Sequence, residues 1–382
     1  MLGPSQCDFN GVGAGRIVRG GFLRPVALVA VLMFMGISCT SNLAKADEGG
    51  VGFWLPGLFG SLAAAPEVPG WSLGMIYIHD SVSASSNVAT ARAITIGQFN
   101  PTLTERLNAS LRATSDIGVI SPTYVFATPV WGGQAAVSLA AIYGNSGADI
   151  NGTLSGTLGP IPFSRAFDVS DSRDAFGDLF PQFALRWNAG VNNWMTYVTG
   201  DIPVGAYDSA RLANLGLGHG AIDAGAGYTY FDQKTGYEFS TVAGFTYNFI
   251  NPSTDYQNGV DFHIDWGASK FLTKQWQIGV VGYFFNQISC DSGAGDKVGC
   301  FETRVAGIGP QIGYIFPINE HYQGYINLKG FGEFAAEHRA DGWNTWLTLA
   351  ISPSPRPRRL QPPQWYTNKN PSRAAIGWVR NG

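Results

Sequence analysis

Charged side chains are scarce in this sequence, and their scarcity excludes several classes of protein. Asp, Glu, Lys and Arg together make up 13% of the 382 residues, against about a quarter in an ordinary soluble domain. The net charge of −3 leaves no strongly basic surface of the kind that binds nucleic acid. A mean hydropathy of +0.02 is too low for a bundle of membrane helices.

Cysteine is rare as well, with four residues in the whole chain. Cys7 and Cys39 fall in the N-terminal leader described below. Cys290 and Cys300 flank a short stretch containing Gly and Asp, and in an exported chain this arrangement predicts a disulfide. A metal-binding pair is the weaker interpretation, because no further ligands cluster nearby in the sequence. We therefore predict a disulfide, no metal site and no cofactor.

The N-terminus predicts export. Arg16, Arg19 and Arg24 precede the apolar run 25–38, and an Ala-Lys-Ala site ends at Ala46. A charged region, a short apolar region and a small-residue site are typical of a secretory signal peptide. The run is shorter than the roughly 20 residues of a spanning helix, although an uncleaved anchor stays open. We assign residues 1–46 to the signal peptide, whose first residues also allow a misassigned start.

Glycine and aromatic residues are abundant, and they occur in stretches with a two-residue period. The stretch VDFHIDWGAS, residues 260–269, has only apolar residues at its even positions, whereas Asp261, His263 and Asp265 occupy odd positions. This period is that of a β-strand with different surroundings on its two faces. Similar alternation recurs in residues 222–230 and 237–249, and frequent alternation favours an antiparallel sheet.

The alternation predicts an all-β fold, an antiparallel transmembrane β-barrel of about 12–14 strands over residues 71–352. The weakest expected strands are 71–79, 91–99 and 105–114. Short turns alternate with longer loops, as in outer-membrane barrels. The longer loops are expected at 144–176, 203–220, 290–300 and 335–342.

One face of each strand is expected to meet lipid and the other to meet a wet lumen. A closed sheet satisfies all its backbone groups, so that a chain this polar can still span a membrane. The lumen-lining residues predicted from the polar faces are Asp223, Glu238, Asp261, His263, Asp265, Lys329 and Glu333. The alternative is a soluble periplasmic sandwich or barrel, which would have to bury nearly all the aromatic residues.

Two segments fall outside the predicted strands. Residues 47–70 are apolar but interrupted by proline and glycine, which rules out a regular spanning helix. They form either a plug or gate in the lumen or a loosely packed lead-in, and both interpretations stay open. The tail, residues 353–382, is basic and rich in proline, so we predict that it is disordered.

Several long motifs resemble a known bacterial family. They are GFWLPGLFGSLAAAPEVPGWS, PTYVFATPVWGGQAAV, VTGDIPVGAY, RLANLGLGHGAIDAGAGYTYFD, YQNGVDFHIDWGASKFL and TRVAGIGPQIGYIFP. Together they are similar to the proteins linked to the meta-pathway of phenol degradation, from about residue 47 to residue 352. The resemblance implies an outer-membrane barrel that conducts aromatic or other hydrophobic compounds. By analogy, fatty-acid channels are barrels with an N-terminal plug. The long tail departs from barrels that end on an aromatic residue.

The candidate chemistry does not favour an enzyme. The sequence contains no nucleophile elbow, Walker loop or zinc-protease motif. Asp261 and Asp265 lie about 13–14 Å apart on a straight strand, too far to hold one small ion together with His263. A barrel-borne lipid hydrolase would need a serine paired with His79 or His263, and the sequence does not pair them.

We therefore predict an outer-membrane channel for passive uptake of small hydrophobic or aromatic compounds. Its expected partners are outer-membrane lipid and these solutes, with no nucleic acid, and the oligomeric state stays open. The alternatives are a barrel-borne lipid hydrolase or lipid-modifying enzyme, and a structural barrel with a closed lumen.

Overall fold

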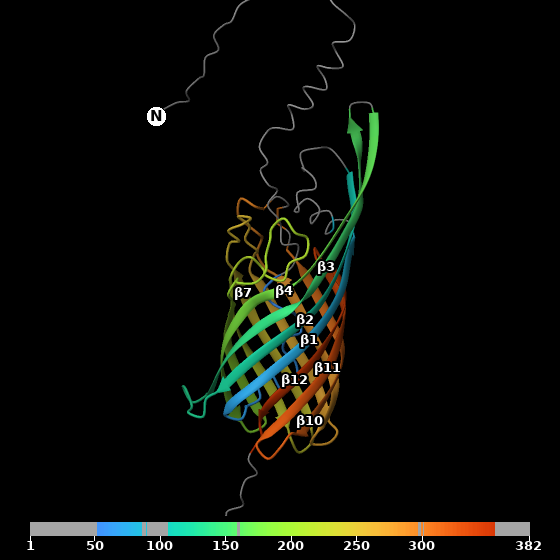
Figure 1. Ribbon diagram of the computed structural model, residues 1–382. Coiled ribbons are helices and arrows are strands. Elements are labelled where there is room, and N and C mark those ends of the chain that lie inside the picture. Colours follow the sequence, from blue (N-terminus) through green and yellow to red (C-terminus); the bar gives the residue numbers. More distant parts are fainter. Residues whose placement is uncertain are drawn as a thin grey trace, which may run out of the picture. The chain divides into compact units, whose positions relative to one another are not determined.

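The computed structural model describes residues 52–85, 89, 106–158, 161–296, 299–300 and 302–355. Within these residues, twelve antiparallel strands form a closed barrel (Figure 1). The strands are β1 (Gly70–Ser85), β2 (Arg106–Val125), β3 (Gln134–Leu158), β4 (Ile161–Ala189), β5 (Asn192–Asp201), β6 (Ala221–Asp232), β7 (Tyr237–Asn248), β8 (Asp261–Phe271), β9 (Trp276–Gln287), β10 (Arg304–Pro317), β11 (Tyr322–Glu337) and β12 (Asp341–Pro353).

Each strand pairs with the strands before and after it, and β1 pairs with β12 to close the ring. Around the closed ring every strand is paired on both sides, so the backbone can cross hydrocarbon. Among the described residues, no helix is long and apolar enough to span a membrane. The predicted all-β transmembrane barrel is confirmed, and its twelve strands lie at the lower end of the predicted range.

The weakest predicted strands have mixed outcomes. Residues 71–79 lie in β1 and residues 106–114 lie in β2. The third weak prediction, 91–99, falls outside the described residues. So do the predicted leader, 1–46, and the tail beyond residue 355.

Two of the predicted loops are wrong. Residues 144–176 were expected to form a loop, but β3 and β4 stay paired from Gly144↔Ala175 to Leu158↔Ile161. The N-terminal half of β2, from Arg106 to Ile117, pairs along the same part of β3. Figure 1 shows β3 and β4, in green, extending past the other strands. Gly, Ser, Asp and Asn dominate this ribbon, so its composition resembles that of a loop. Pairing also shortens the expected loop 335–342 to residues 338–340.

The connections differ between the two ends of the barrel. At one end they are short, covering residues 126–133, 190–191, 233–236, 272–275 and 318–321. At the other end, residues 202–220, 249–260 and 288–303 form longer connections. We call these the short-turn end and the long-loop end, and the alternation is that of outer-membrane barrels.

The two faces of the wall differ as the two-residue period predicts. In β7, exposed and buried positions alternate along most of the strand. Its outward residues include Phe239, Phe245 and Tyr247, which are exposed, whereas Glu238 and Ser240 face inward and are buried. The outer wall is therefore apolar and aromatic, as contact with lipid requires.

The outward face gives a stability prediction. Leu328 is 49% exposed near the middle of β11. Replacing it with arginine places a charge in hydrocarbon, which costs about 2–4 kcal/mol near the bilayer midplane. We expect the Leu328→Arg variant to lose this amount of unfolding free energy in a urea titration performed in lipid.

The matched control is Glu320→Arg, which adds an arginine at an exposed turn residue of the short-turn end. We expect a change below about 0.5 kcal/mol there. Equal losses in the two variants would contradict the assignment of the outer wall to lipid.

Candidate functional site

The interior of the barrel is polar along β8. Asp261, His263 and Asp265 face inward and are each at most 3% exposed. The alternate residues Phe262, Ile264 and Trp266 are only partly buried and lie on the outer face. A charged group buried in this way needs hydrogen-bond or ionic partners, because an unpaired buried charge is very costly.

The partners of Asp265 come from a distant part of the chain. Residues 52–65, which we call the N-terminal segment, lie inside the barrel. Asp265 Oδ1 accepts a hydrogen bond from Gly57 N at 2.9 Å, and Asp265 Oδ2 accepts one from Phe59 N at 3.1 Å. Both carboxylate oxygens are thus satisfied by backbone amides that no regular secondary structure pairs. Hydrogen bonds to a charged group are worth about 1.5–3 kcal/mol each.

Lys329 and Gln311 hold the N-terminal segment from the other side. Lys329 Nζ donates to Gly57 O at 2.5 Å, and its ammonium lies 4.8 Å from the centre of the Trp346 ring. Gln311 Nε2 donates to Ser61 Oγ at 2.6 Å. Segment residue Gly57 is therefore held between a carboxylate and an ammonium group.

Further toward the short-turn end, Glu238 and Thr229 accept hydrogen bonds from backbone amides of the same segment. Leu62 N donates to Glu238 Oε1 at 2.9 Å, and Ala64 N donates to Thr229 Oγ1 at 3.0 Å. Beyond the segment, Glu67 forms an ion pair with Arg186 at 3.0 Å. These contacts follow the chain order, so residues 52–67 thread the lumen from the long-loop end to the short-turn end.

Aromatic stacking covers the buried histidine. The Trp54 ring stacks on the His263 ring with centroids 3.5 Å apart and an angle of 14°. His263 Nε2 lies 2.9 Å from Asp223 Oδ2 and 3.4 Å from Tyr197 Oη. Thr246 Oγ1 donates to Asp223 Oδ2 at 2.6 Å. The histidine is thus part of a polar network closed off by tryptophan.

The remaining predicted interior residues also have partners. Asp261 Oδ2 accepts from Asn248 Nδ2 at 2.9 Å. Glu333 accepts from Tyr283 Oη at 2.7 Å and from Gly342 N at 3.0 Å. The structure therefore brings six of the seven predicted residues into contact with the N-terminal segment or with a network beside it, and Glu333 lies near the long-loop end.

A cavity of about 310 Å³ lies above the N-terminal segment at the long-loop end. Phe53 and Trp54 of the segment line it from one side, and Leu212 and Leu217 of the β5–β6 connection line it from another. Phe180 contributes to the wall, and its ring lies 5.6 Å from that of Phe53. The cavity is therefore mostly apolar and is bounded by two segments that are not part of the sheet.

Two aspartates of β4 anchor loop 203–220, which makes up nearly all of the β5–β6 connection, inside the barrel. Asp178 accepts from Gly205 N at 2.6 Å and from Leu217 N at 2.7 Å, which ties both ends of the loop. Asp171 pairs with Arg211 at 2.5 Å, and this hydrogen bond raises the pKa of the Arg211 guanidinium. The loop therefore forms a fixed roof over the cavity.

A register shift makes both anchors face inward. Asp171 and Asp178 are separated by an odd number of residues, so a regular strand would point them to opposite faces. The pairing of β3 with β4 shifts between Ala141 and Tyr143, and such a bulge reverses the alternation. At the same place, a side chain on Gly205 would come within 2.4 Å of the Gly177 carbonyl carbon, so the loop crosses in close backbone contact.

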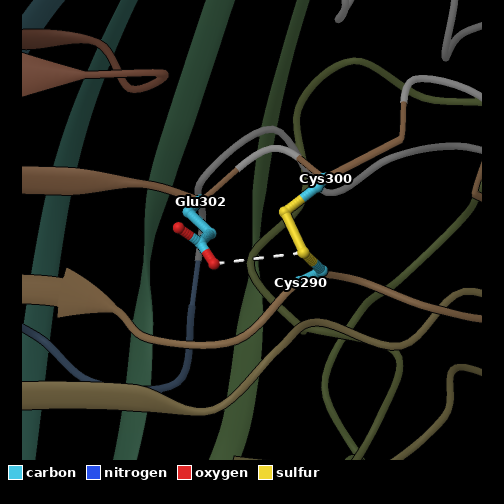
Figure 2. Close-up of side chains that lie close together, drawn as sticks. All are labelled: Cys290, Cys300 and Glu302. Atoms are coloured by element: carbon cyan, nitrogen blue, oxygen red, sulfur yellow. Dashed lines mark hydrogen bonds between the residues drawn. A yellow bond between two sulfur atoms is a disulfide. The ribbon is translucent and has the colours of Figure 1, made fainter.

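Cys290 and Cys300 are joined in a disulfide in the β9–β10 connection (Figure 2). Glu302 lies beside them, and the three residues form the one group of three potential metal-ligand residues found within the described ranges. Sulfurs that are bonded to each other cannot act as thiolate ligands. The group is therefore a covalent staple of an exposed loop.

The interior histidine is not arranged for nucleophilic catalysis. The hydrogen bonds of His263 go to Asp223 and Tyr197. His79 instead bonds Asp116 at 2.8 Å. Neither histidine shows a hydrogen bond to a serine among the described residues, so the arrangement that a lipid hydrolase needs is not found there.

Sequence reasoning missed several residues of this region. Arg186 and Gln311 lie in alternating stretches, and a search for every polar inward position would have found them. Asp171 and Asp178 gave no such signal, because the register shift hides their common face. Tyr197 is an aromatic residue within a polar network, so a polar-row search passes over it.

A closed antiparallel barrel with an apolar outer wall and a polar, occupied interior defines a barrel protein of the outer-membrane type. The chain belongs to the family described as "Putative MetA-pathway of phenol degradation", whose model matches residues 93–349. The family resemblance drawn from the motifs is thereby confirmed. No curated protein matches the sequence.

One solved structure shows the same fold, and two others are similar at lower scores. An outer membrane channel from Pseudomonas putida F1 is similar with a TM-score of 0.54 and 13% identity, over 76% of this chain and 98% of that chain. A FadL homologue from Pseudomonas aeruginosa gives a TM-score of 0.31 and 10% identity, over 74% and 89%. The CymD monoaromatic hydrocarbon channel gives 0.33 and 9%, over 83% and 99%. Only the first likeness supports the fold.

The contacts of Asp265 give a prediction about the N-terminal segment. Asp265→Asn removes the charge and leaves at most one good acceptor for the amides of Gly57 and Phe59. Loss of one charge-assisted bond, at about 1.5–3 kcal/mol, should speed amide exchange in residues 52–65 by roughly ten- to a hundredfold. Hydrogen exchange with mass spectrometry measures this rate.

The control is Asp232→Asn at the end of β6, where the carboxylate accepts hydrogen bonds from Lys234 N and Thr235 Oγ1 of the following turn. Exchange in residues 52–65 should not change there. If Asp265→Asn leaves that exchange at the wild-type rate, Asp265 does not hold the segment.

Proposed function

We propose that this protein is an outer-membrane channel for passive uptake of small hydrophobic or aromatic compounds. The observation that carries the proposal is the threaded N-terminal segment, which occupies the lumen of a closed barrel through hydrogen bonds, ring stacking and apolar packing. A segment held by such contacts can shift without breaking a covalent bond or a strand pair.

The N-terminal segment acts as the gate in this proposal. Its contacts to Asp265, Lys329 and Glu238 close the route, and displacement toward either end opens it. The lumen then presents the polar residues Asp223, Glu238, Asp261, His263, Asp265, Lys329 and Glu333 together with aromatic rings. A lining that carries both signs of charge disfavours large ions of either sign.

Passage of an apolar solute needs weak and repeated contacts, since the solute must leave as well as enter. The rings of Trp54, Phe59 and Tyr197 form a compact cluster with centroid separations between 5.3 and 6.2 Å. Aromatic faces of this kind offer contact to a planar solute without a charged anchor. The family's description and the similar Pseudomonas putida fold support a channel role.

The leader and the disulfide belong to the same proposal. Residues 1–46 direct export, and Cys290 and Cys300 are oxidised after export in a compartment that favours disulfides. The long-loop end then faces the medium, as in other outer-membrane barrels. We assign no catalytic step and no cofactor to the chain.

Uptake by intact cells tests this function directly. Small aromatic compounds cross plain lipid vesicles unaided, so the test uses Gram-negative cells whose outer leaflet blocks them. Expression of the chain should raise the initial uptake of radiolabelled toluene at micromolar concentration several-fold. The difference should disappear when the outer membrane is permeabilised.

The other outcomes identify the alternatives. Lipid turnover that His263→Ala abolishes, without faster uptake, would contradict the channel and favour an enzyme. If a correctly inserted barrel gives no uptake and no lipid turnover, the channel proposal is contradicted and a structural barrel is favoured.

A further inference from the structure

The cavity under loop 203–220 has the size of a small aromatic molecule. Its volume is about 310 Å³, whereas an apolar cavity of about 150 Å³ already binds benzene. One ring or two fused rings fit such a space, and ligand sites of this kind usually start near 300 Å³. The cavity therefore limits the size of what it can hold.

The walls of the cavity suit a flat apolar ring. Phe53 and Phe180 provide tilted aromatic faces, and Ile117, Ile142 and Leu212 provide aliphatic surface. Aromatic pairs in offset or edge arrangements gain energy beyond that of area burial. These side chains come from the N-terminal segment, the wall and the roof, so the ring would touch all three.

One side of the cavity is charged, with more negative than positive groups. Asp80, Glu333 and Arg339 line it there, and Asp80 interacts electrostatically with both of the others. Arg211 also lines the cavity, but its positive charge is neutralised by the ion pair with Asp171. Two carboxylates against one guanidinium leave one net negative charge facing the occupant.

An excess carboxylate sets the polarity of the ligand. It accepts a hydrogen bond from a hydroxyl group, and each carboxylate offers about four lone-pair positions. It repels an aromatic carboxylate, because like charges at close range disfavour binding. We propose that this cavity is a binding site for neutral hydroxylated aromatic molecules of one or two rings, with Asp80 as the residue that selects against aromatic acids.

This inference rests on the proposed channel function, since it names the solute class that the route first binds. The site lies at the long-loop end, above the gate formed by residues 52–65, so a solute from the medium would reach it before the gate. Loop 203–220, fixed by Asp178 and Asp171, keeps the roof in place.

Calorimetric titration of the purified protein in detergent tests the site. Phenol should bind with saturation, and benzoate, which has the same ring but is anionic at pH 7, should bind at least tenfold more weakly. Asp80→Asn should reduce this phenol-to-benzoate ratio at least threefold. An unchanged ratio would overturn the role of Asp80, and equal binding of the two ligands by the wild type would overturn the selectivity.

A filling variant locates the binding. Ala113 lines the cavity from β2, and Ala113→Phe should abolish phenol binding. Arg112→Phe places the same ring on the opposite, exposed face of the strand and should leave binding intact. Heat-modified gel mobility confirms that both variants fold, and phenol binding retained by a folded Ala113→Phe variant would place the site elsewhere.

The binding site and the channel function can be contradicted independently of each other. Uptake of toluene by cells with no calorimetric binding of phenol would overturn the site while leaving the channel in place. Absence of uptake with saturable binding at Ala113 would support the site and contradict the channel.

Discussion

A buried carboxylate must be paired, and in this barrel the pairing of Asp265 fixes the contents of the lumen. Both of its oxygens accept hydrogen bonds from backbone amides of the N-terminal segment. The segment in turn has Pro56 and several glycines, so it forms no helix or strand that would satisfy its own backbone. The segment supplies both hydrogen bonds of Asp265, and Asp265 satisfies two amides that no helix or strand pairs. Each therefore stabilises the other.

The same pairing between side chains of the wall and amides of the segment explains how the interior is arranged from one end to the other. Glu238 and Thr229 receive the later amides of the segment, and Trp54 covers His263. Above the segment, polar groups give way to the apolar cavity, whose roof is tied down by Asp178. The fold thus places a ring-sized apolar space directly next to a gate made of polar contacts.

A small number of contacts sets the balance between closed and open states. Each charge-assisted bond contributes about 1.5–3 kcal/mol, and water that enters the lumen can replace part of this on opening. A strand pair would be far harder to break, because the whole sheet is closed. Movement is therefore expected in the segment rather than in the wall.

The sequence predicted the wall better than the contents of the lumen. Residues 260–269 gave the strand and both of its faces, because a two-residue period depends only on neighbouring residues. The ribbon 144–176 was missed because small and polar residues outnumber its few large apolar residues, such as Ile150, Phe167 and Val169, which pack in a buried cluster. Asp171 and Asp178 were missed because a register shift changes which residues share a face. The partner of Asp265 lies more than 200 residues away, and no local pattern reports such a contact.

The most direct test of the account is to lock the N-terminal segment to the wall. Ser61 and Gln311 are in hydrogen-bond contact, so Ser61→Cys with Gln311→Cys should form a disulfide that fixes the gate. Toluene uptake by cells should fall at least tenfold after oxidation and recover on reduction, while the parent chain treated in the same way should not change. Complete cross-linking on a non-reducing gel together with undiminished uptake would contradict the claim that passage requires the segment to move.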